Sequence, residues 1–220
     1  MDLLGWFSSG SILFPFLSGI VTKSKQDKPL KLLNAFFIVS FIAECLGTYY
    51  ARSGINNLWM ITLFTPIEFT FLMSILSYYN PPFQKVLRGT IIPFLILFIL
   101  INYFFEDIKH FNIYSRPLES ILLTLGSAHT LFFTIQKKPL TFYAMPPFWV
   151  CIAIIVFFAG NIVIFALANW TLSLPKPNAV FFSSIYMVFN ILGNILFALA
   201  FWSPLFGKQS LEMAKEEERD

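Results

Sequence analysis

Two neighbouring stretches decide the fold, and each contains one glutamate: LNAFFIVSFIAECLGTYYA at residues 33–51 and LWMITLFTPIEFTFLMSILSYY at residues 58–79. About 20 apolar residues cross the hydrocarbon core of a bilayer as a helix, and both stretches have that length. An acidic side chain at the centre of such a helix costs about 2.5–3.5 kcal/mol on insertion scales. We therefore expect Glu44 and Glu68 to face protein or a cavity and to have a function there.

The composition of the whole chain agrees with a membrane protein. Its 220 residues are 57% hydrophobic and 12% charged, whereas soluble domains have about 25% charged residues. Seven apolar runs reach spanning length, at about 3–21, 33–51, 58–79, 89–105, 117–135, 147–169 and 180–202. They predict an all-α seven-helix bundle over residues 1–206, with the first helix kinked at Pro15. Residues 207–220 form a short charged tail, predicted as a solvated helix end or a disordered stub.

The distribution of basic residues predicts the orientation in the membrane. One set of connections, together with the tail, has eleven Lys and Arg residues, and the opposite set has four, namely Arg52, Lys109, Arg116 and Lys176. Cytoplasmic loops carry the excess of basic residues. We therefore expect the N-terminus outside and the C-terminus in the cytoplasm. The net charge of +3 lies in these clusters and does not indicate a nucleic-acid partner.

A weak internal similarity predicts a 3+1+3 parallel repeat. Lys28-Pro29-Leu30 precedes the second run, and Lys138-Pro139-Leu140 precedes the sixth. Glu44 lies eight residues before Arg52, as Asn161 lies eight before Asn169. On the next runs, Glu68 lies eleven residues after Asn57, as Asn190 lies eleven after Ala179, so Asn190 corresponds to Glu68. Some transporters are built from such repeats, with their substrate site near the membrane midplane.

The two glutamates are predicted to lie at similar depth on adjacent antiparallel helices. At 1.5 Å per residue, Glu44 lies about 12 Å and Glu68 about 16 Å below the connection that joins their helices. If the two carboxyl groups meet, they share one proton, because two adjacent carboxyl groups cannot both be ionised in a low-dielectric site. Such a pair suits proton coupling or cation binding. The alternative is that two protonated carboxyls tie helices together through hydroxyl and amide partners.

Other polar residues in the apolar runs are candidates for the same cavity. Asn161, Asn190 and Asn194 carry amides that must face another helix or water, either as helix-packing groups or as part of a pocket with the glutamates. Arg116 and Glu119 are i, i+3 neighbours near the predicted outer interface. Below them, Ser127, Thr130 and Thr134 continue along one face. This set is either the mouth of a pathway or a surface ion pair of little energetic value.

The sequence has no pattern that indicates a metal or another cofactor. His129 is the one histidine inside an apolar run, and it has no second donor at helical spacing. We expect it to be a buried hydrogen-bonding group. No lysine lies inside a run, and no phosphate-binding or nucleophile motif is present.

Several stretches resemble a group of small bacterial seven-helix membrane proteins of uncharacterised activity. They are residues 54–59 (GINNLW), 66–69 (PIEF), 114–116 (YSR), 118–120 (LES), 160–161 (GN), 190–192 (NIL) and 194–198 (NILFA). The resemblance covers most of the chain. It implies that these polar positions belong together, and it implies no activity.

These observations lead to three functional hypotheses. The first is proton-linked transport or binding of a small solute or cation in a midplane cavity formed by Glu44, Glu68, Asn161, Asn190 and Asn194, with Arg116 and Glu119 at its mouth. The second is a receptor-like sensor or an accessory subunit that acts through a protein partner in the membrane. The third, which has the least support, is an intramembrane enzyme that acts on lipid by carboxylate acid–base chemistry.

Overall fold

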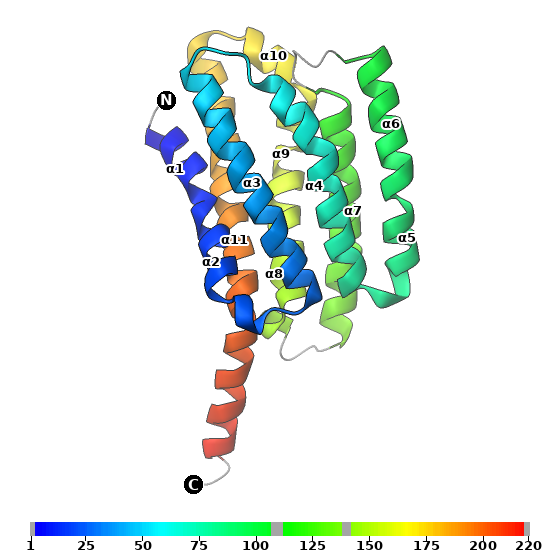
Figure 1. Cartoon of the computed structure of the whole chain (residues 1–220), viewed down its shortest axis with the longest axis vertical. Coiled ribbons are helices and arrows are strands. Elements are labelled where there is room, and N and C mark those ends of the chain that lie inside the picture. Colours follow the sequence, from blue (N-terminus) through cyan, green and yellow to red (C-terminus); the bar gives the residue numbers. More distant parts are fainter. Residues whose placement is uncertain (1–2, 107–111, 138–141, 218–220) are drawn as a thin grey trace.

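The computed structural model describes residues 3–106, 112–137 and 142–217, and within these the chain is helical with no strand. Seven helical segments are long and apolar enough to cross a membrane. Figure 1 shows them as a bundle of roughly parallel and antiparallel helices. They are Leu3–Val21, Lys28–Arg52, Leu58–Tyr79, Pro81–Phe104, Ser115–Lys137, Pro146–Ala166 and Val180–Leu205. The prediction of a seven-helix membrane bundle is confirmed to this extent. The Lys138-Pro139-Leu140 tripeptide lies outside the described residues.

The first segment is broken close to the predicted kink. It consists of α1 (Leu3–Ser11) and α2 (Leu13–Val21), separated at Ile12. Pro15 lies in the first turn of α2. Its ring would clash with the carbonyl of Ser11, four residues earlier, so the helical hydrogen bonds are interrupted just before the proline. The Ser11 hydroxyl donates to the Ser8 carbonyl at 2.6 Å, which keeps the end of α1 compact.

The second and third segments form a helical hairpin. The short 3-10 turn η1 (Lys23–Lys25) leads into α3 (Lys28–Arg52), where Asp27 caps the first turn by accepting from the Leu30 amide at 3.0 Å. The connection to α4 (Leu58–Tyr79) turns at Gly54, whose φ of 68° favours glycine. The Asn57 amide donates to the Gly47 carbonyl at 3.1 Å and ties the two helices together. We call the end of the bundle that holds this connection the hairpin end.

The fourth segment lies at one side of the bundle, and the fifth runs beside α4 (Figure 1). The fourth is made of η2 (Pro81–Phe83), α5 (Gln84–Gly89) and α6 (Ile91–Phe104), and the fifth is α7 (Ser115–Lys137). α4 and α7 run parallel, and three polar contacts join residues 48 to 50 positions apart: Thr62 with Asn112, Glu68 with Arg116, and Asn80 with Thr130.

The sixth segment changes its helical type in the middle. After η3 (Phe142–Ala144), it begins as α8 (Pro146–Ile154), passes through the π-helical turn η4 (Ile155–Ala159) and continues as α9 (Gly160–Ala166). It packs closely on the seventh segment through two glycines. A side chain at Gly160 would meet the Phe189 ring at 2.6 Å, and one at Gly193 would meet Phe157 at 3.2 Å.

The chain ends in one long helix. After α10 (Ala168–Ser173), α11 runs from Lys176 to Glu217, and its last turns project beyond the bundle (Figure 1). The predicted boundary between the membrane domain and the tail at 206/207 therefore falls inside a continuous helix. The buried core between the segments is largely aromatic. Phe69 stacks on Phe94 with ring centroids 3.8 Å apart, and Phe37 packs edge-on against Phe197 at 5.2 Å.

Candidate functional site

Several residues at and just before the start of α7 are buried, among them Asn112, Ser115 and Arg116. Asn112 accepts a hydrogen bond from Thr62 at 2.8 Å and is 1% exposed, although it precedes the helix. Glu106 then caps the helix, because its carboxylate accepts from the amides of Tyr114 at 2.7 Å and Ser115 at 3.2 Å. An acidic group at a helix N-terminus is favoured by the unpaired amides there. This cap brings the next residue, Arg116, into the protein interior.

Arg116 joins two carboxylates on two helices. Its Nη1 donates to Oε2 of Glu68 on α4 and to Oε2 of Glu119 on α7, the latter at 2.8 Å. Arg116 is 6%, Glu68 8% and Glu119 0% exposed. The predicted Arg116–Glu119 pair therefore exists, but it is buried and not an exposed interfacial pair. Glu68 is the third member of this group, whereas the sequence pattern indicates it only as a possible partner of Glu44.

The electrostatic consequence is that Glu68 is compensated within the protein. The guanidinium cation offsets one of the two carboxylates it contacts, and its Cζ lies 5.3 Å from the Phe165 ring centroid. Buried ion pairs of this kind are retained only where geometry and hydrogen bonds compensate for desolvation. Oε1 of Glu119 and Nε of Arg116 are buried and make no hydrogen bond to the described residues. The three side chains thus form one compact charged group, which we call the Arg116 triad.

Glu44 is in a different situation, although it lies on the neighbouring helix α3. Its side chain is half-buried, and its carboxylate makes no hydrogen bond or ion pair with the described residues. No hydrogen bond joins it to Glu68, whose carboxylate is held by Arg116. The direct contact that a shared proton would use is therefore absent, because the rotation of α4 turns Glu68 toward α7.

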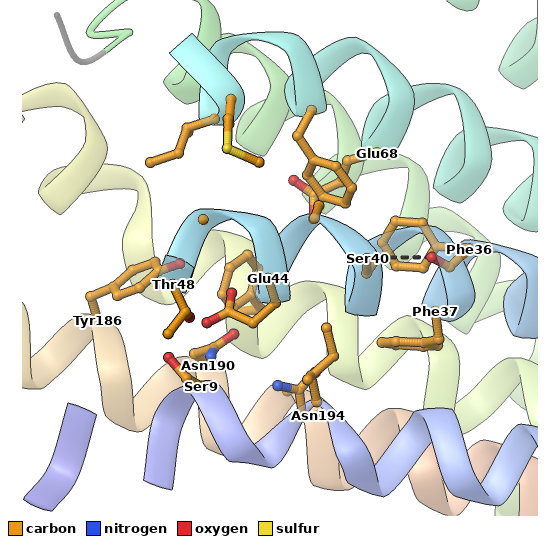
Figure 2. Close-up of a pocket in the computed structure, with 18 of the residues that line it drawn as sticks. Ser9, Phe36, Phe37, Ser40, Glu44, Thr48, Glu68, Tyr186, Asn190 and Asn194 are labelled. Carbon is orange, nitrogen blue, oxygen red and sulfur yellow. Dashed lines mark hydrogen bonds between the residues drawn. The ribbon is translucent and has the colours of Figure 1, made fainter. Parts of the chain in front are cut away.

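Both glutamates nevertheless line one cavity of about 320 Å³. It lies between α3, α4 and α11, with further walls from α1, η4 and Arg116 of α7. Its polar lining consists of Ser9, Ser40, Glu44, Thr48, Asn57, Glu68, Arg116, Tyr186, Asn190 and Asn194, and its aromatic lining of Phe36, Phe37, Phe64, Phe157, Phe158 and Phe197. Figure 2 shows Glu44, Thr48, Ser9 and Asn190 gathered around one part of it. Most polar groups lie toward the hairpin end, and the aromatic rings close the deeper part.

Asn190 and Asn194 line this cavity and also hold α11 against α1. The Asn190 Nδ2 donates to the carbonyl of Ser8 at 3.2 Å and to its hydroxyl at 3.0 Å. The Asn194 Nδ2 donates to the Ser11 hydroxyl at 2.8 Å. The two predicted roles, helix packing and cavity lining, are therefore combined in the same side chains.

Asn161 does not belong to the cavity. It is 0% exposed, and its Nδ2 donates to the Phe157 carbonyl of its own segment at 2.7 Å. The π-helical turn just before it places Phe157 and Phe158 on the cavity wall in its stead. The prediction that Asn161 joins the glutamates is corrected, because one extra residue in that turn rotates the amide away.

The half of the α4–α7 interface that lies farther from the hairpin end is filled by side chains and does not continue the cavity. Asn80 Nδ2 lies 2.8 Å from Nδ1 of His129 and 3.3 Å from the Thr130 hydroxyl. His129 also stacks on Phe83 with centroids 4.2 Å apart. It is a hydrogen-bonding group, as predicted, but it is exposed at the surface of the bundle and not buried. Ser127, Thr130 and Thr134 are buried but do not line the cavity. The hydroxyl stripe is therefore part of a helix interface.

Three contributors were missed from the sequence. Glu106 and Asn112 lie in what was read as an outer loop, and only the hydrogen bonds reveal that Glu106 caps α7 and that Asn112 is buried against α4. Tyr186 lines the cavity at the i, i+4, i+8 spacing that it shares with Asn190 and Asn194. This spacing was the available signal for Tyr186.

No known protein family, no curated protein and no solved structure matches this chain. What the cavity does must therefore be inferred from its own geometry.

Proposed function

We propose that the chain binds a small solute or cation in this cavity and moves it across the membrane together with protons, with Glu44 as the protonatable group. One observation carries the proposal: Glu44 is a carboxylate within a membrane-spanning helix that faces a cavity and has no partner among the described residues. Carboxylates inside membrane segments are rare and expensive, and they mark ion and proton pathways. A purely structural carboxyl would be hydrogen-bonded to a neighbouring helix, as Glu68 is.

The form of the cavity supports the same function. Its volume of about 320 Å³ is at the lower end of the range of small-molecule sites, which are mostly apolar with a few placed polar groups. The Arg116 triad places one guanidinium and its two paired carboxylates at one wall, and Glu44 places a carboxylate without a protein partner at another. Protonation of Glu44 would therefore change the net charge that the cavity presents to a solute.

The test is flux in liposomes that contain a pH-sensitive dye. The purified chain is reconstituted and challenged with a panel of inorganic cations, amines and neutral solutes. We expect solute-dependent proton movement that Glu44→Gln abolishes and that Cys45→Ala leaves unchanged, because Cys45 is exposed on the same helix and does not line the cavity. Absence of flux for the whole panel, with a stoichiometric protein partner recovered from native membranes, would favour the sensor or accessory-subunit hypothesis.

The orientation and the membrane also belong to the proposal. The excess of basic residues supports an outside N-terminus and a cytoplasmic C-terminus. The resemblance to small bacterial seven-helix proteins supports a location in the bacterial inner membrane. In a background without native cysteines, Ser53→Cys should react with an impermeant maleimide only from outside, and Lys85→Cys only from the cytoplasmic side. The reverse pattern would overturn the proposed orientation. The 3+1+3 repeat remains a prediction.

A further inference from the structure

The hydrogen bonds between α1 and α11 determine how the Asn190 amide is oriented. The Ser8 carbonyl can only accept, so the group that reaches it at 3.2 Å must be the NH₂ of Asn190. The same NH₂ lies 3.0 Å from the Ser8 hydroxyl oxygen. The amide oxygen Oδ1 is therefore left over, and it accepts no hydrogen bond from the described residues. A reversed amide would place two acceptors against each other.

The Asn194 amide is oriented by the same argument, one turn further along α11. The Ser11 hydroxyl uses its proton to donate to the Ser8 carbonyl at 2.6 Å, so its oxygen acts as the acceptor for Asn194 Nδ2 at 2.8 Å. The Asn194 Oδ1 is again the atom without a partner. Both asparagines line the cavity, and neither Oδ1 is among the fully buried polar atoms. Two acceptor oxygens are thus directed to open space.

Glu44 adds a third acceptor group, and it is charged. Figure 2 shows its carboxylate beside Asn190. Several donors of the lining are already in use: Arg116 donates to Glu68 and Glu119, the Asn57 NH₂ donates to the Gly47 carbonyl, and the Ser40 hydroxyl donates to the Phe36 carbonyl. The hydroxyls of Ser9, Thr48 and Tyr186 also line the cavity, and they are neutral groups that can donate or accept. Arg116 is also the only cationic residue among the described residues of the lining. With two carboxylates and one guanidinium in its lining, the cavity therefore favours a cation over an anion.

The deeper part of the cavity suits an apolar group. Phe36, Phe37 and Phe197 line it below Asn194, and Phe37 and Phe197 are in edge contact with centroids 5.2 Å apart. Aromatic faces attract cations as well as apolar groups. A ligand that fills both parts has a positive end with several N–H donors and an apolar body.

We propose that the solute is a primary amine in its protonated form. Its ammonium group donates to the Glu44 carboxylate and to Oδ1 of Asn190 and Asn194, three acceptors for three N–H donors. Its apolar body packs against Phe36, Phe37 and Phe197. This inference rests on the proposed function, because it assigns a substrate class to the same cavity.

The test uses phenethylamine as the probe and the full chain in lipid nanodiscs, with binding measured by titration calorimetry at pH 7. We expect saturable binding of phenethylamine. The neutral analogue 2-phenylethanol and the quaternary analogue phenethyltrimethylammonium, which has no N–H, should each bind at least about tenfold more weakly, since a hydrogen bond to a charged group is worth about that factor. This comparison needs no mutation and is independent of any folding defect.

The variants locate the ammonium group. Glu44→Gln should weaken phenethylamine binding about tenfold or more, Asn190→Leu should weaken it severalfold, and Cys45→Ala should leave it unchanged. Equal affinity for the amine and the alcohol, or for the native chain and Glu44→Gln, would overturn the proposal. Absence of phenethylamine binding, or displacement of it by millimolar NaCl that leaves choline chloride without effect, would also overturn it. If the amine proposal fails but another solute shows Glu44-dependent flux, the proposed function stands and only the assignment of a primary amine as the substrate is wrong.

Discussion

The α4–α7 interface and the space between α3 and α11 both place polar side chains within the membrane-spanning part of the bundle, but they satisfy them differently. Along the α4–α7 interface, Thr62, Glu68 and Asn80 each form a hydrogen bond with a side chain 48 to 50 residues later in the chain, in α7 or just before it. Between α3 and α11, Glu44 faces the Asn190 and Asn194 amides across a cavity and has no protein partner. An intramembrane carboxylate is therefore not by itself a functional site. Whether it has a structural or a functional role depends on whether a protein group pairs with it.

The largest expected effect comes from breaking the Arg116 triad. Arg116→Met leaves two buried carboxylates without their cation, and removing one member of a buried pair costs about 3–5 kcal/mol of unfolding free energy. Denaturation in detergent measures the loss. The matched control is Arg52→Met, because Arg52 is exposed and lies over the Trp6 ring, and its removal should cost much less. Equal losses for the two variants would show that the triad is not a buried electrostatic unit.

The same variant can be rescued, which sharpens the comparison. Adding Glu68→Gln and Glu119→Gln to Arg116→Met removes the two stranded charges, and we expect it to restore a substantial part of the lost stability. Glu44→Gln added to Arg116→Met should restore none, because no interaction joins Glu44 to Arg116. Rescue by Glu44→Gln would mean that the two regions are one charged network.

An intermediate effect is expected at the lower end of the α4–α7 interface. Asn80→Leu removes the partner of His129 Nδ1 and of the Thr130 hydroxyl, and Asn80 is 0% exposed. We expect a loss of about 1–2 kcal/mol in detergent unfolding, with flux unchanged. Altered solute specificity in Asn80→Leu would contradict the assignment of this interface to packing.

Much of the fold could be predicted from the sequence, because the length of an apolar run is a local property. The seven runs correspond to the seven helical segments, and the break near Pro15 follows from the proline ring. The site was only partly predictable. Glu44, Glu68, Asn190 and Asn194 do share one cavity with Arg116, but Asn161 does not. A π-helical turn is not visible in the residue pattern, and it alters the face of every residue that follows it.

The partner of Glu68 could not be predicted, since it lies 48 residues away on a helix whose starting depth is set by a loop. The Arg116 position was read as interfacial because it begins an apolar run. The cap by Glu106 and the contact between Thr62 and Asn112 place it inside the bundle. The rotation and depth of a helix depend on such long-range contacts, and these contacts cannot be inferred from the residue periodicity of one helix alone.

A smaller effect is expected for the three asparagines, each replaced by leucine. Interhelical hydrogen bonds such as those of Asn190 and Asn194 average about 0.6 kcal/mol, and Asn161 bonds within its own segment, so each variant should lose little stability. Asn190→Leu and Asn194→Leu should change the stabilisation by added solutes between pH 5 and 8, and Asn161→Leu should not, because it lies outside the cavity. Melting curves with and without solute separate the two groups. Identical solute responses in all three would show that the amides serve packing alone.

The smallest expected effect on stability is at Glu44, and it is the most direct test of the central claim that this carboxylate serves a solute and not the fold. Glu44→Gln keeps the shape of a side chain that has no protein partner, so its unfolding free energy should stay within about 0.5 kcal/mol of the native chain. The decisive measurement is proton-linked solute flux in liposomes made from this variant and from the native chain, at equal protein content. The account predicts native-like stability with flux reduced to the level of empty liposomes. Native-like flux, or a stability loss as large as that of Arg116→Met, would contradict it.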